Sequence, residues 1–232
     1  KLRVIDAVCP LVTRVHNEAK KYHRQGKKVL LVGHRGHQEV RGTMGQVEMT
    51  LIDDDPGAEL PSWDTDAEVV VLTQTTLSVG DTASAISAIK DRFSGAVVRN
   101  DICYATTNRQ DAVKAAAPGC DLFAVVGAPN SSNSRRLVEV ALKAGAERSI
   151  LLQRASEIDW DDIGEISTLG LSAGASAPEV VVAEIIDAFR DRFDVTIELA
   201  ETTQETENFL VNRELRDVEL TIDDMAFVNG TN

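Results

Sequence analysis

The sequence is poor in aromatic residues, which make up 4% of the chain against 43% hydrophobic residues in all. The core must therefore be built from Val, Ile, Leu and Ala. No apolar run approaches the roughly 20 consecutive residues that a membrane-spanning helix requires. The first ten residues contain no apolar stretch typical of a signal peptide. These absences predict a globular protein that does not reside in a membrane.

Cysteine is also scarce, since the chain has only Cys9, Cys103 and Cys120 and no CxxC pair. An odd number of cysteines without a secretory signal argues against a disulfide framework and predicts a cytoplasmic protein. The absence of CxxC excludes a self-contained zinc or ferredoxin motif. We expect Cys120 to be a buried packing residue, as free cysteines often are.

Basic residues are in deficit: 24 Lys and Arg stand against 37 Asp and Glu, for a formal charge of −13. This excludes a nucleic-acid partner, which needs a basic surface. It does not exclude a small anion, because helix N-termini, backbone N–H groups and hydroxyls bind anions whatever the net charge. Neither a Walker motif nor GxGxxG occurs, so no nucleotide is indicated.

Short apolar runs alternate with segments of helical periodicity along most of the chain, which predicts an α/β protein with mainly parallel sheets covered on both faces. The predicted strands are residues 28–33, 68–73, 121–127, 149–152 and 168–171. The predicted helices are residues 78–93, 133–144 and 179–193.

The pattern runs through twice, each time starting from a cysteine-bearing turn at Cys9 or Cys103. We therefore predict two similar small α/β domains and an irregular C-terminal tail. Their ranges are residues 1–97, 98–195 and 196–232, with a possible edge strand at 208–211 in the tail. A strand-like run begins directly after Lys1, so we expect the chain to be incomplete at its N-terminus.

Polar turns follow four of the predicted strands: HRGHQE after Gly33, QTTLS after Thr73, APNSSNS after Gly127 and SAGASAP after Leu171. In parallel sheets ligands bind at the carboxyl ends of the strands. N-capping explains one Ser or Asn per helix but not several in a row. Clustered hydroxyls near helix N-termini predict a phosphate or diphosphate site.

The residue types alone leave the chemistry open. Cys9 and Cys103 precede helical segments, and a helix N-terminus favours the thiolate form of cysteine. Their spacing alone is equally consistent with metal ligands and with buried packing residues. His34, His37 and Glu39 lie together in a Gly-rich turn and could bind metal, bind phosphate or move protons. Three interpretations remain at this point: an iron–sulfur enzyme, a non-catalytic phospho-ligand-binding module, and a zinc hydrolase using His34, His37 and Glu39.

Taken together, the motifs resemble the 4-hydroxy-3-methylbut-2-enyl diphosphate reductases, the family that ends the methylerythritol phosphate route to isoprenoids. The resemblance spans nearly the whole chain and keeps the family's motif order. The matching runs are DAVCPLVTRVH (6–16), GHRGHQEVRGTMGQ (33–46), TQTTLSV (73–79), NDICYATTNRQ (100–110), NSSNS (130–134), SAGASAPE (172–179) and RELR (213–216).

The resemblance implies three similar α/β domains around a [4Fe–4S] cluster held by three cysteines, with one iron open to the substrate hydroxyl. It implies removal of that hydroxyl to give isopentenyl and dimethylallyl diphosphates, with ferredoxin or flavodoxin as the electron donor. A third cysteine would come from a domain that this chain lacks. The chain alone would then be inactive, or only a phospho-ligand-binding fragment.

Residue by residue, the resemblance implies Cys9 and Cys103 as cluster ligands. It implies catalytic roles for Glu39, Thr75 and His37, with Glu39 as the acid of a proton relay. The implied substrate-binding residues are His37, Gln74, Thr75, Thr106, Asn108, Ser131, Ser132, Asn133 and Ser176.

Overall fold

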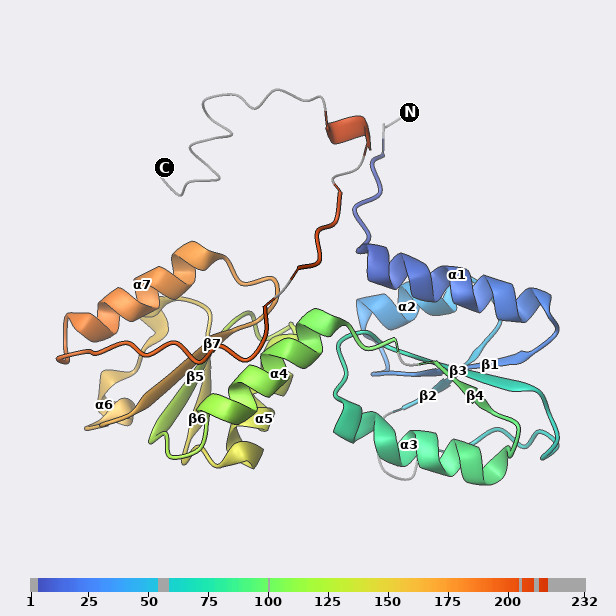
Figure 1. The fold of residues 1–232 in the computed structure, drawn as a ribbon, viewed down its shortest axis with the longest axis horizontal. Coiled ribbons are helices and arrows are strands. Elements are labelled where there is room, and N and C mark those ends of the chain that lie inside the picture. Colours follow the sequence, from blue (N-terminus) through green and yellow to red (C-terminus); the bar gives the residue numbers. More distant parts are fainter. Residues whose placement is uncertain (1–3, 54–58, 100, 205, 211–212, 217–232) are drawn as a thin grey trace.

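The computed structural model describes residues 4–53, 59–99, 101–204, 206–210 and 213–216, and its core is two parallel sheets (Figure 1). The four-stranded sheet has the order β2-β1-β3-β4 and the three-stranded sheet the order β6-β5-β7. The strands are β1 (Lys28–Val32), β2 (Thr50–Ile52), β3 (Val69–Thr73), β4 (Val97–Val98), β5 (Leu122–Val126), β6 (Ser149–Leu152) and β7 (Leu169–Ala173).

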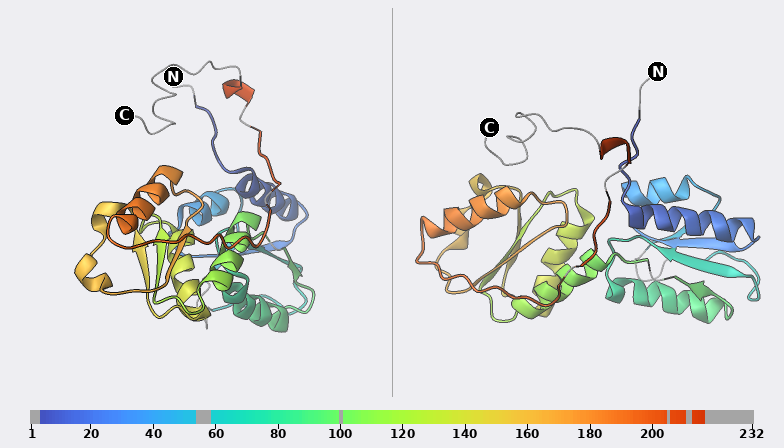
Figure 2. Two further views of the ribbon diagram at one scale, coloured as in Figure 1. Left: turned by 60° about the vertical axis from the view of Figure 1, so that its left-hand side comes forward. Right: turned by 45° about the horizontal axis from the view of Figure 1, so that its top comes forward.

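Helices cover both faces of each sheet, as the two further views in Figure 2 show. In the first half, α1 and α2 lie on one face and α3 on the other; in the second half, α7 lies opposite α4 and α5. The helices are α1 (Pro10–Arg24), α2 (Gln38–Met44), α3 (Val79–Arg92), α4 (Tyr104–Ala116), α5 (Ser132–Ala144), α6 (Trp160–Ile163) and α7 (Glu179–Arg190), with short 3-10 turns at Ala155–Glu157 and Arg213–Leu215.

Strand alternation divides the core of the first sheet between its two faces. Leu30 and Val32 pack with Phe93 at the end of α3, whereas Val29 and Leu31 pack against α1 and α2. Successive strand side chains point to opposite faces, so a strand buried on both must be apolar throughout. This is why KVLLVG contains no polar alternation.

The second sheet repeats this division. Phe123 and Val125 face α4 and α5, whereas Ala124 and Val126 face α7 and Phe189. Strand β1 lies between β2 and β3, and in the same way β5 lies between β6 and β7. The two halves thus share the core topology that the repeated sequence pattern predicts.

The predicted α/β class with mainly parallel sheets is confirmed, and the five predicted strands and three predicted helices occur close to the predicted residues. Strand β2 was not predicted because it spans only three residues. The predicted edge strand at 208–211 is wrong over residues 208–210, where no strand forms, and Val211 lies outside the described residues. The domain boundaries at 97/98 and 195/196 stay predictions. Among the described residues, no helix is long and apolar enough to cross a membrane.

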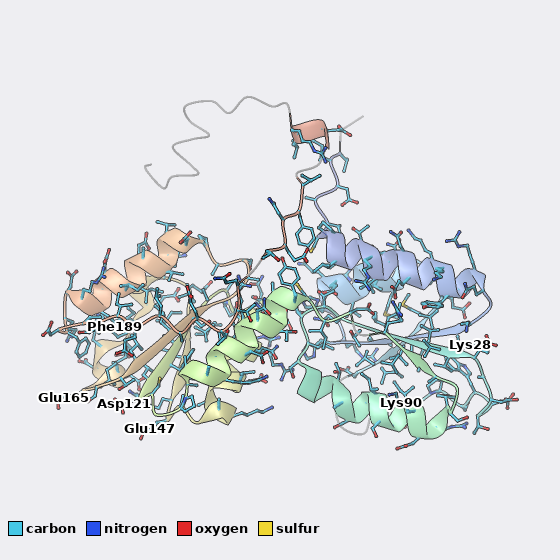
Figure 3. All side chains as sticks on the ribbon, in the orientation of Figure 1. Lys28, Lys90, Asp121, Glu147, Glu165 and Phe189 are labelled. Carbon is cyan, nitrogen blue, oxygen red and sulfur yellow. The ribbon has the colours of Figure 1, made fainter. Side chains whose placement is uncertain are left out.

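The carboxyl ends of the strands in both sheets point toward the middle of the molecule. Lys28 starts β1 and Asp121 precedes β5, and Figure 3 places both at the outer edges of the two halves. The strands run inward from these points. The polar turns of the two halves therefore lie where the halves approach each other.

Candidate functional site

Cys9 and Cys103 occupy the same position in the two halves. Each is the N-cap residue of a helix, α1 or α4, with ψ of 133° in both cases. Neither uses its side chain in a capping hydrogen bond. Cys9 is exposed and Cys103 half-buried, whereas Cys120 is buried, with Sγ donating to the Ala116 carbonyl at 3.1 Å. The prediction that Cys120 is a packing residue is confirmed.

Glu39 and Thr75 form the most closely bonded polar pair of the site. Glu39 is the second residue of α2, and Thr75 follows β3. The carboxylate receives the Thr75 backbone N–H at 2.7 Å on one oxygen and the Thr75 hydroxyl at 2.9 Å on the other. Both carboxylate oxygens are therefore held by one residue.

Burial raises the pKa of Glu39 above its usual range, and the charge of Asp101 adds to the rise. The two Thr75 hydrogen bonds oppose it by favouring the charged form. Burial is the larger effect, so Glu39 holds a proton at a higher pH than a surface glutamate does. Such a carboxyl keeps a proton available for transfer at a higher pH than an ordinary glutamate.

Thr75 also connects this acid to the second candidate metal ligand. The Cys103 backbone N–H donates to the Thr75 carbonyl at 2.9 Å. Glu39, Thr75 and Cys103 therefore form one hydrogen-bonded unit, although they are separated by 36 and 28 positions in the chain. Periodicity could place these residues at strand ends but not pair them.

His37 is the N-cap of α2, and its Nδ1 accepts the Glu39 backbone N–H at 3.2 Å. A neutral His37 therefore carries its proton on Nε2. Burial lowers the pKa of His37, and the nearby His34 and Arg135 lower it further. Arg135 lies on α5, in the second half of the chain.

Gln74 is buried and engaged at both ends of its amide. Its Oε1 accepts the His34 backbone N–H at 3.0 Å, and its Nε2 donates to the Thr76 hydroxyl at 2.7 Å. Gln74 thus ties the end of β1 to the end of β3. Both ends of its side-chain amide are used inside the protein, and its role in substrate binding stays a prediction.

The SSNS turn presents a different arrangement at the end of β5. Ser131 is the N-cap of α5, and its Oγ accepts from the backbone N–H of Ser134 at 3.3 Å and from the Ser134 hydroxyl at 3.0 Å. Ser132 and Asn133 are also buried. Among the described residues, neither Oδ1 nor Nδ2 of Asn133 has a hydrogen-bond partner. Buried amides are normally hydrogen-bonded, so both ends of this side chain are available to a polar partner.

Glycine is required around Ser134. A Cβ on Gly127 would lie 2.2 Å from the Ser134 Oγ, and one on Gly174 would lie 2.1 Å from it. The ends of β5 and β7 therefore approach the first turn of α5 more closely than any side chain permits. This packing brings the SSNS turn next to the GASAP turn that carries Ser176, which is exposed.

The remaining predicted residues lie on α4, directly after Cys103. Thr106 is buried, and its backbone N–H donates to the Cys103 carbonyl at 2.9 Å. Asn108 lies further along the helix and is partly buried. The structure therefore links Glu39, Thr75 and Cys103 by direct hydrogen bonds. The roles of all the predicted site residues stay predictions.

The donor set fits an iron–sulfur cluster better than a zinc ion. Cys9 and Cys103 present thiols at helix N-termini, and cysteine sulfur is the usual ligand of iron–sulfur clusters. Glu39 and His37, by contrast, are already engaged with Thr75 and the α2 backbone. The described residues contain no group of three or more His, Cys, Asp or Glu side chains arranged to hold a metal ion. The two cysteines can thus be only part of a ligand set.

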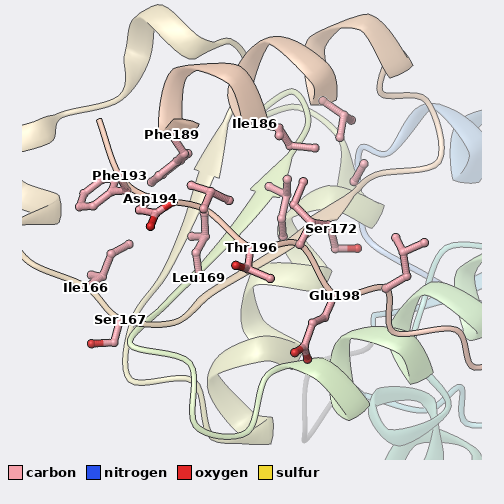
Figure 4. A pocket seen from close by; sticks show the side chains of 16 residues that line it. Ile166, Ser167, Leu169, Ser172, Ile186, Phe189, Phe193, Asp194, Thr196 and Glu198 are labelled. Carbon is pink, nitrogen blue, oxygen red and sulfur yellow. The ribbon is translucent and has the colours of Figure 1, made fainter. Parts of the chain in front are cut away.

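A cavity of about 610 Å³ lies elsewhere, between β7, α7 and residues 193–199 (Figure 4). Its lining includes Leu169, Ile186 and Phe189 but none of the predicted site residues. In the first sheet β4 pairs with the outer side of β3, whereas in the second sheet no described strand pairs with the outer side of β7. The cavity lies on that side of β7. We interpret it as a groove left at a sheet edge.

Three residues near the site were not singled out from the sequence: Asp101, Ser134 and Arg135. Asp101 is buried, which raises its pKa to about 6. Each of the three lies within a run that carries the family resemblance or directly beside one. Proximity to Cys103 or to the SSNS turn was the only signal that could have identified them.

Comparison with known proteins agrees with this geometry. A family model described as LytB protein matches residues 1–190. Proteins named 4-hydroxy-3-methylbut-2-enyl diphosphate reductase are 63% identical in Rhizobium leguminosarum bv. trifolii (strain WSM2304) and in Brucella abortus (strain S19). Each alignment covers 97% of this chain, and 69% and 67% of the respective relative. The chain thus spans about two thirds of their length.

A solved structure is similar over nearly the whole chain. It is titled as the E-1-hydroxy-2-methyl-but-2-enyl-4-diphosphate reductase from Plasmodium falciparum, with a TM-score of 0.79 and 26% identity. The match covers 98% of this chain and 70% of that one. On the family model, the sequence identities and the fold, the chain belongs to the LytB protein family.

Proposed function

We propose that this protein is an iron–sulfur reductase that removes the allylic hydroxyl of 4-hydroxy-3-methylbut-2-enyl diphosphate, giving isopentenyl and dimethylallyl diphosphates. The observation that carries the proposal is the hydrogen-bonded unit of Glu39, Thr75 and Cys103. It joins a buried acid to a cysteine at a helix N-terminus. Relatives of 63% identity bear the corresponding name.

The reaction consumes two electrons and two protons, breaks one C–O bond, forms one C–H bond and releases water. Hydroxide is a poor leaving group, so a proton must reach the departing oxygen. The Glu39 carboxyl lies 2.9 Å from the Thr75 hydroxyl. When Glu39 is protonated, this hydrogen bond can reverse, so that the Glu39 carboxyl donates to the Thr75 oxygen and the Thr75 hydroxyl donates to the substrate hydroxyl.

Cys9 and Cys103 would hold the [4Fe–4S] cluster together with a further ligand. When bound, such a cluster supplies the electrons and an open iron that acts as a Lewis acid on the hydroxyl. Ferredoxin or flavodoxin would deliver the electrons. The Cys103 backbone bond to Thr75 keeps this ligand next to the proton donor.

The second half of the site would bind the diphosphate. Asn133 offers a buried amide without a partner among the described residues, at the start of α5. Ser131 and Ser132 add hydroxyls, and a further hydroxyl comes from Ser176, in the turn that follows β7. The N-terminus of α5 favours negative charge, and Nε2–H of His37 is a further donor.

Iron binding by cysteine variants tests the cluster. The chain is reconstituted anaerobically with iron and sulfide in the presence of a small thiol, which can occupy a vacant coordination position. Iron and sulfide are then measured per chain. We expect Cys9→Ser and Cys103→Ser to lose the bound iron and Cys120→Ser to retain it. Equal amounts of bound iron in the wild type and in all three variants would contradict the ligand assignment.

Turnover of the substrate tests the reaction itself. Loss of 4-hydroxy-3-methylbut-2-enyl diphosphate and formation of the two products are followed by mass spectrometry, with reduced methyl viologen as the electron source. A role limited to binding the diphosphate is the second candidate. Two cysteines lie at helix N-termini, and the described residues contain no group of three or more side chains that could hold a metal. Tight diphosphate binding without turnover in the iron-loaded protein would favour that role.

A further inference from the structure

The segment between β4 and α4 stays aligned with β3 beyond the end of β4. The Arg99 N–H donates to the Val71 carbonyl at 2.9 Å, and the Cys103 N–H donates to the Thr75 carbonyl at 2.9 Å. Between them, the Asp101 N–H donates to the Thr73 hydroxyl at 3.3 Å. Each donor is 28 residues after its acceptor, so one register leads from the sheet to the metal-ligand candidate.

Asp101 closes the middle rung of this ladder in both directions. Its Oδ2 accepts the Thr73 backbone N–H at 3.3 Å, while its own N–H donates to the Thr73 side chain. Asp101 is only 9% exposed, and its Oδ1 lacks a partner among the described residues. Burying a carboxylate costs free energy unless hydrogen bonds offset it. Thr73 supplies that offset and fixes the turn two residues before Cys103.

The first rung connects the ladder to the helix that begins after Cys9. Arg99 Nε and Nη2 donate to the two carboxylate oxygens of Glu18 at 2.9 and 3.1 Å. Glu18 lies on α1, and its side chain is largely buried. A two-pronged arginine–carboxylate pair restricts orientation as well as distance. The same short segment therefore touches both cysteine-bearing helices and the strand that leads to Thr75.

We propose that Asp101 is a positioning residue that holds the Cys103 turn against the end of β3 and so sets the place of Cys103 relative to Thr75 and Glu39. Its catalytic relevance rests on the proposed function, but the positioning itself does not. Asp101 acts through the backbone of the turn. Without the Asp101–Thr73 hydrogen bonds, the bond from the Cys103 N–H to the Thr75 carbonyl would be the one left to hold this end of the turn against β3.

Hydrogen exchange at the Cys103 amide measures this positioning directly. In Asp101→Ala we expect this amide to exchange roughly tenfold to a hundredfold faster, the size of effect typical of a lost hydrogen bond to a charged group. Asp101→Asn keeps an oxygen that can accept the Thr73 N–H, so exchange should stay near the wild-type rate. Asp111→Ala, which removes an exposed aspartate on the neighbouring helix, is the matched control.

Amides of β5, in the other sheet, report global unfolding. Acceleration confined to residues 101–103 supports the proposal, whereas equal acceleration in β5 overturns it. Loss of protection in Asp101→Asn equal to that in Asp101→Ala also overturns it. None of these results depends on iron or turnover, so failure of the positioning and failure of the proposed reaction can be told apart.

Thr73 provides a second approach if Asp101→Ala does not fold. Thr73→Val removes the hydroxyl that accepts the Asp101 N–H, and Thr73→Ser restores it. We expect faster exchange at Cys103 in the first variant and near-normal exchange in the second. The double variant Thr73→Val with Asp101→Ala is informative where it folds. Its effect on exchange at Cys103 should be smaller than the sum of the two single effects, because each substitution breaks the same Thr73–Asp101 interaction. Unchanged exchange in Thr73→Val, or full additivity, would overturn the pairing.

Discussion

The turns after β1 and β5 are built alike and carry opposite chemistry. Glu39 stands six residues after Gly33, and Asn133 stands six residues after Gly127. Each is the second residue of the helix that follows its turn. Glu39 is bound twice by Thr75, whereas Asn133 has no partner among the described residues. The same backbone arrangement therefore presents a carboxyl bound by Thr75 in one half and an amide without a partner among the described residues in the other.

The neighbours of these two residues explain the difference. Strand β3 is followed by Thr75, whose backbone N–H and hydroxyl both donate to the Glu39 carboxylate. Strand β7 is followed by Gly174, where even a Cβ would collide with Ser134. Hydrogen bonds within the protein fill the first turn, and the close approach of Gly174 to Ser134 narrows the second. On the proposed function, the repeated fold would divide catalysis and diphosphate binding between its copies through the residues at the strand ends.

The largest effect should come from removing the acid. In a complete enzyme, with the third cluster ligand supplied, we expect Glu39→Ala to lower kcat by about 10²- to 10⁴-fold, the usual contribution of general acid–base catalysis. Binding of inorganic diphosphate should change little, because Glu39 belongs to the other turn. Steady-state kinetics and calorimetry separate the two quantities. Equal losses in kcat and in diphosphate affinity would count against this division.

A charge placed in the second turn should damage binding instead. Asn133→Asp puts a carboxylate where we expect the diphosphate, and truncating or mismatching a buried polar contact costs about 10- to 100-fold in affinity. Asn17→Asp, on the exposed side of α1, is the control with the same charge change. Titration calorimetry with inorganic diphosphate is the measurement. Similar affinity in the two variants would remove Asn133 from the anion site.

Glycine at the end of β5 should be needed for stability. A Cβ on Gly127 would lie 2.2 Å from the Ser134 Oγ and 2.5 Å from its Cβ, so no rotation of Ser134 relieves the clash. We expect Gly127→Ala to lower the free energy of unfolding by about 1–3 kcal/mol, as overpacking does. Gly95→Ala meets no atom within 4 Å and should cost nothing. Urea denaturation of both variants decides this.

The smallest expected effect is the pH dependence of stability from Glu39. Its pKa is raised in the folded protein above the ordinary value of 4.5, so folding favours the protonated form. The stability contributed by this group is present below that value and is lost as pH rises through the higher folded pKa. Relative to Glu39→Gln, the wild type should lose stability as pH rises above about 4.5. A difference that grows in the opposite direction would contradict the raised pKa.

Much of the architecture follows from local sequence. Runs such as KVLLVG and DLFAVVG predict buried parallel strands, because both faces of each strand are apolar. The polar turns at strand ends predict where a ligand site lies. The short β2 and the absence of a strand at 208–210 were not predicted, since such short segments depend on what packs beside them.

The sequence by itself determined the fold class, the repeated plan and the set of candidate residues, because periodicity, strand-end position and motif resemblance are local or ordered along the chain. Only the tertiary structure decided which candidates touch. It joined Glu39 to Thr75 and Cys103, used the Gln74 amide inside the protein and left Asn133 open. It also brought Asp101 against Thr73. These pairings join residues 28 to 40 positions apart, and the register between neighbouring strands that makes them is fixed by packing.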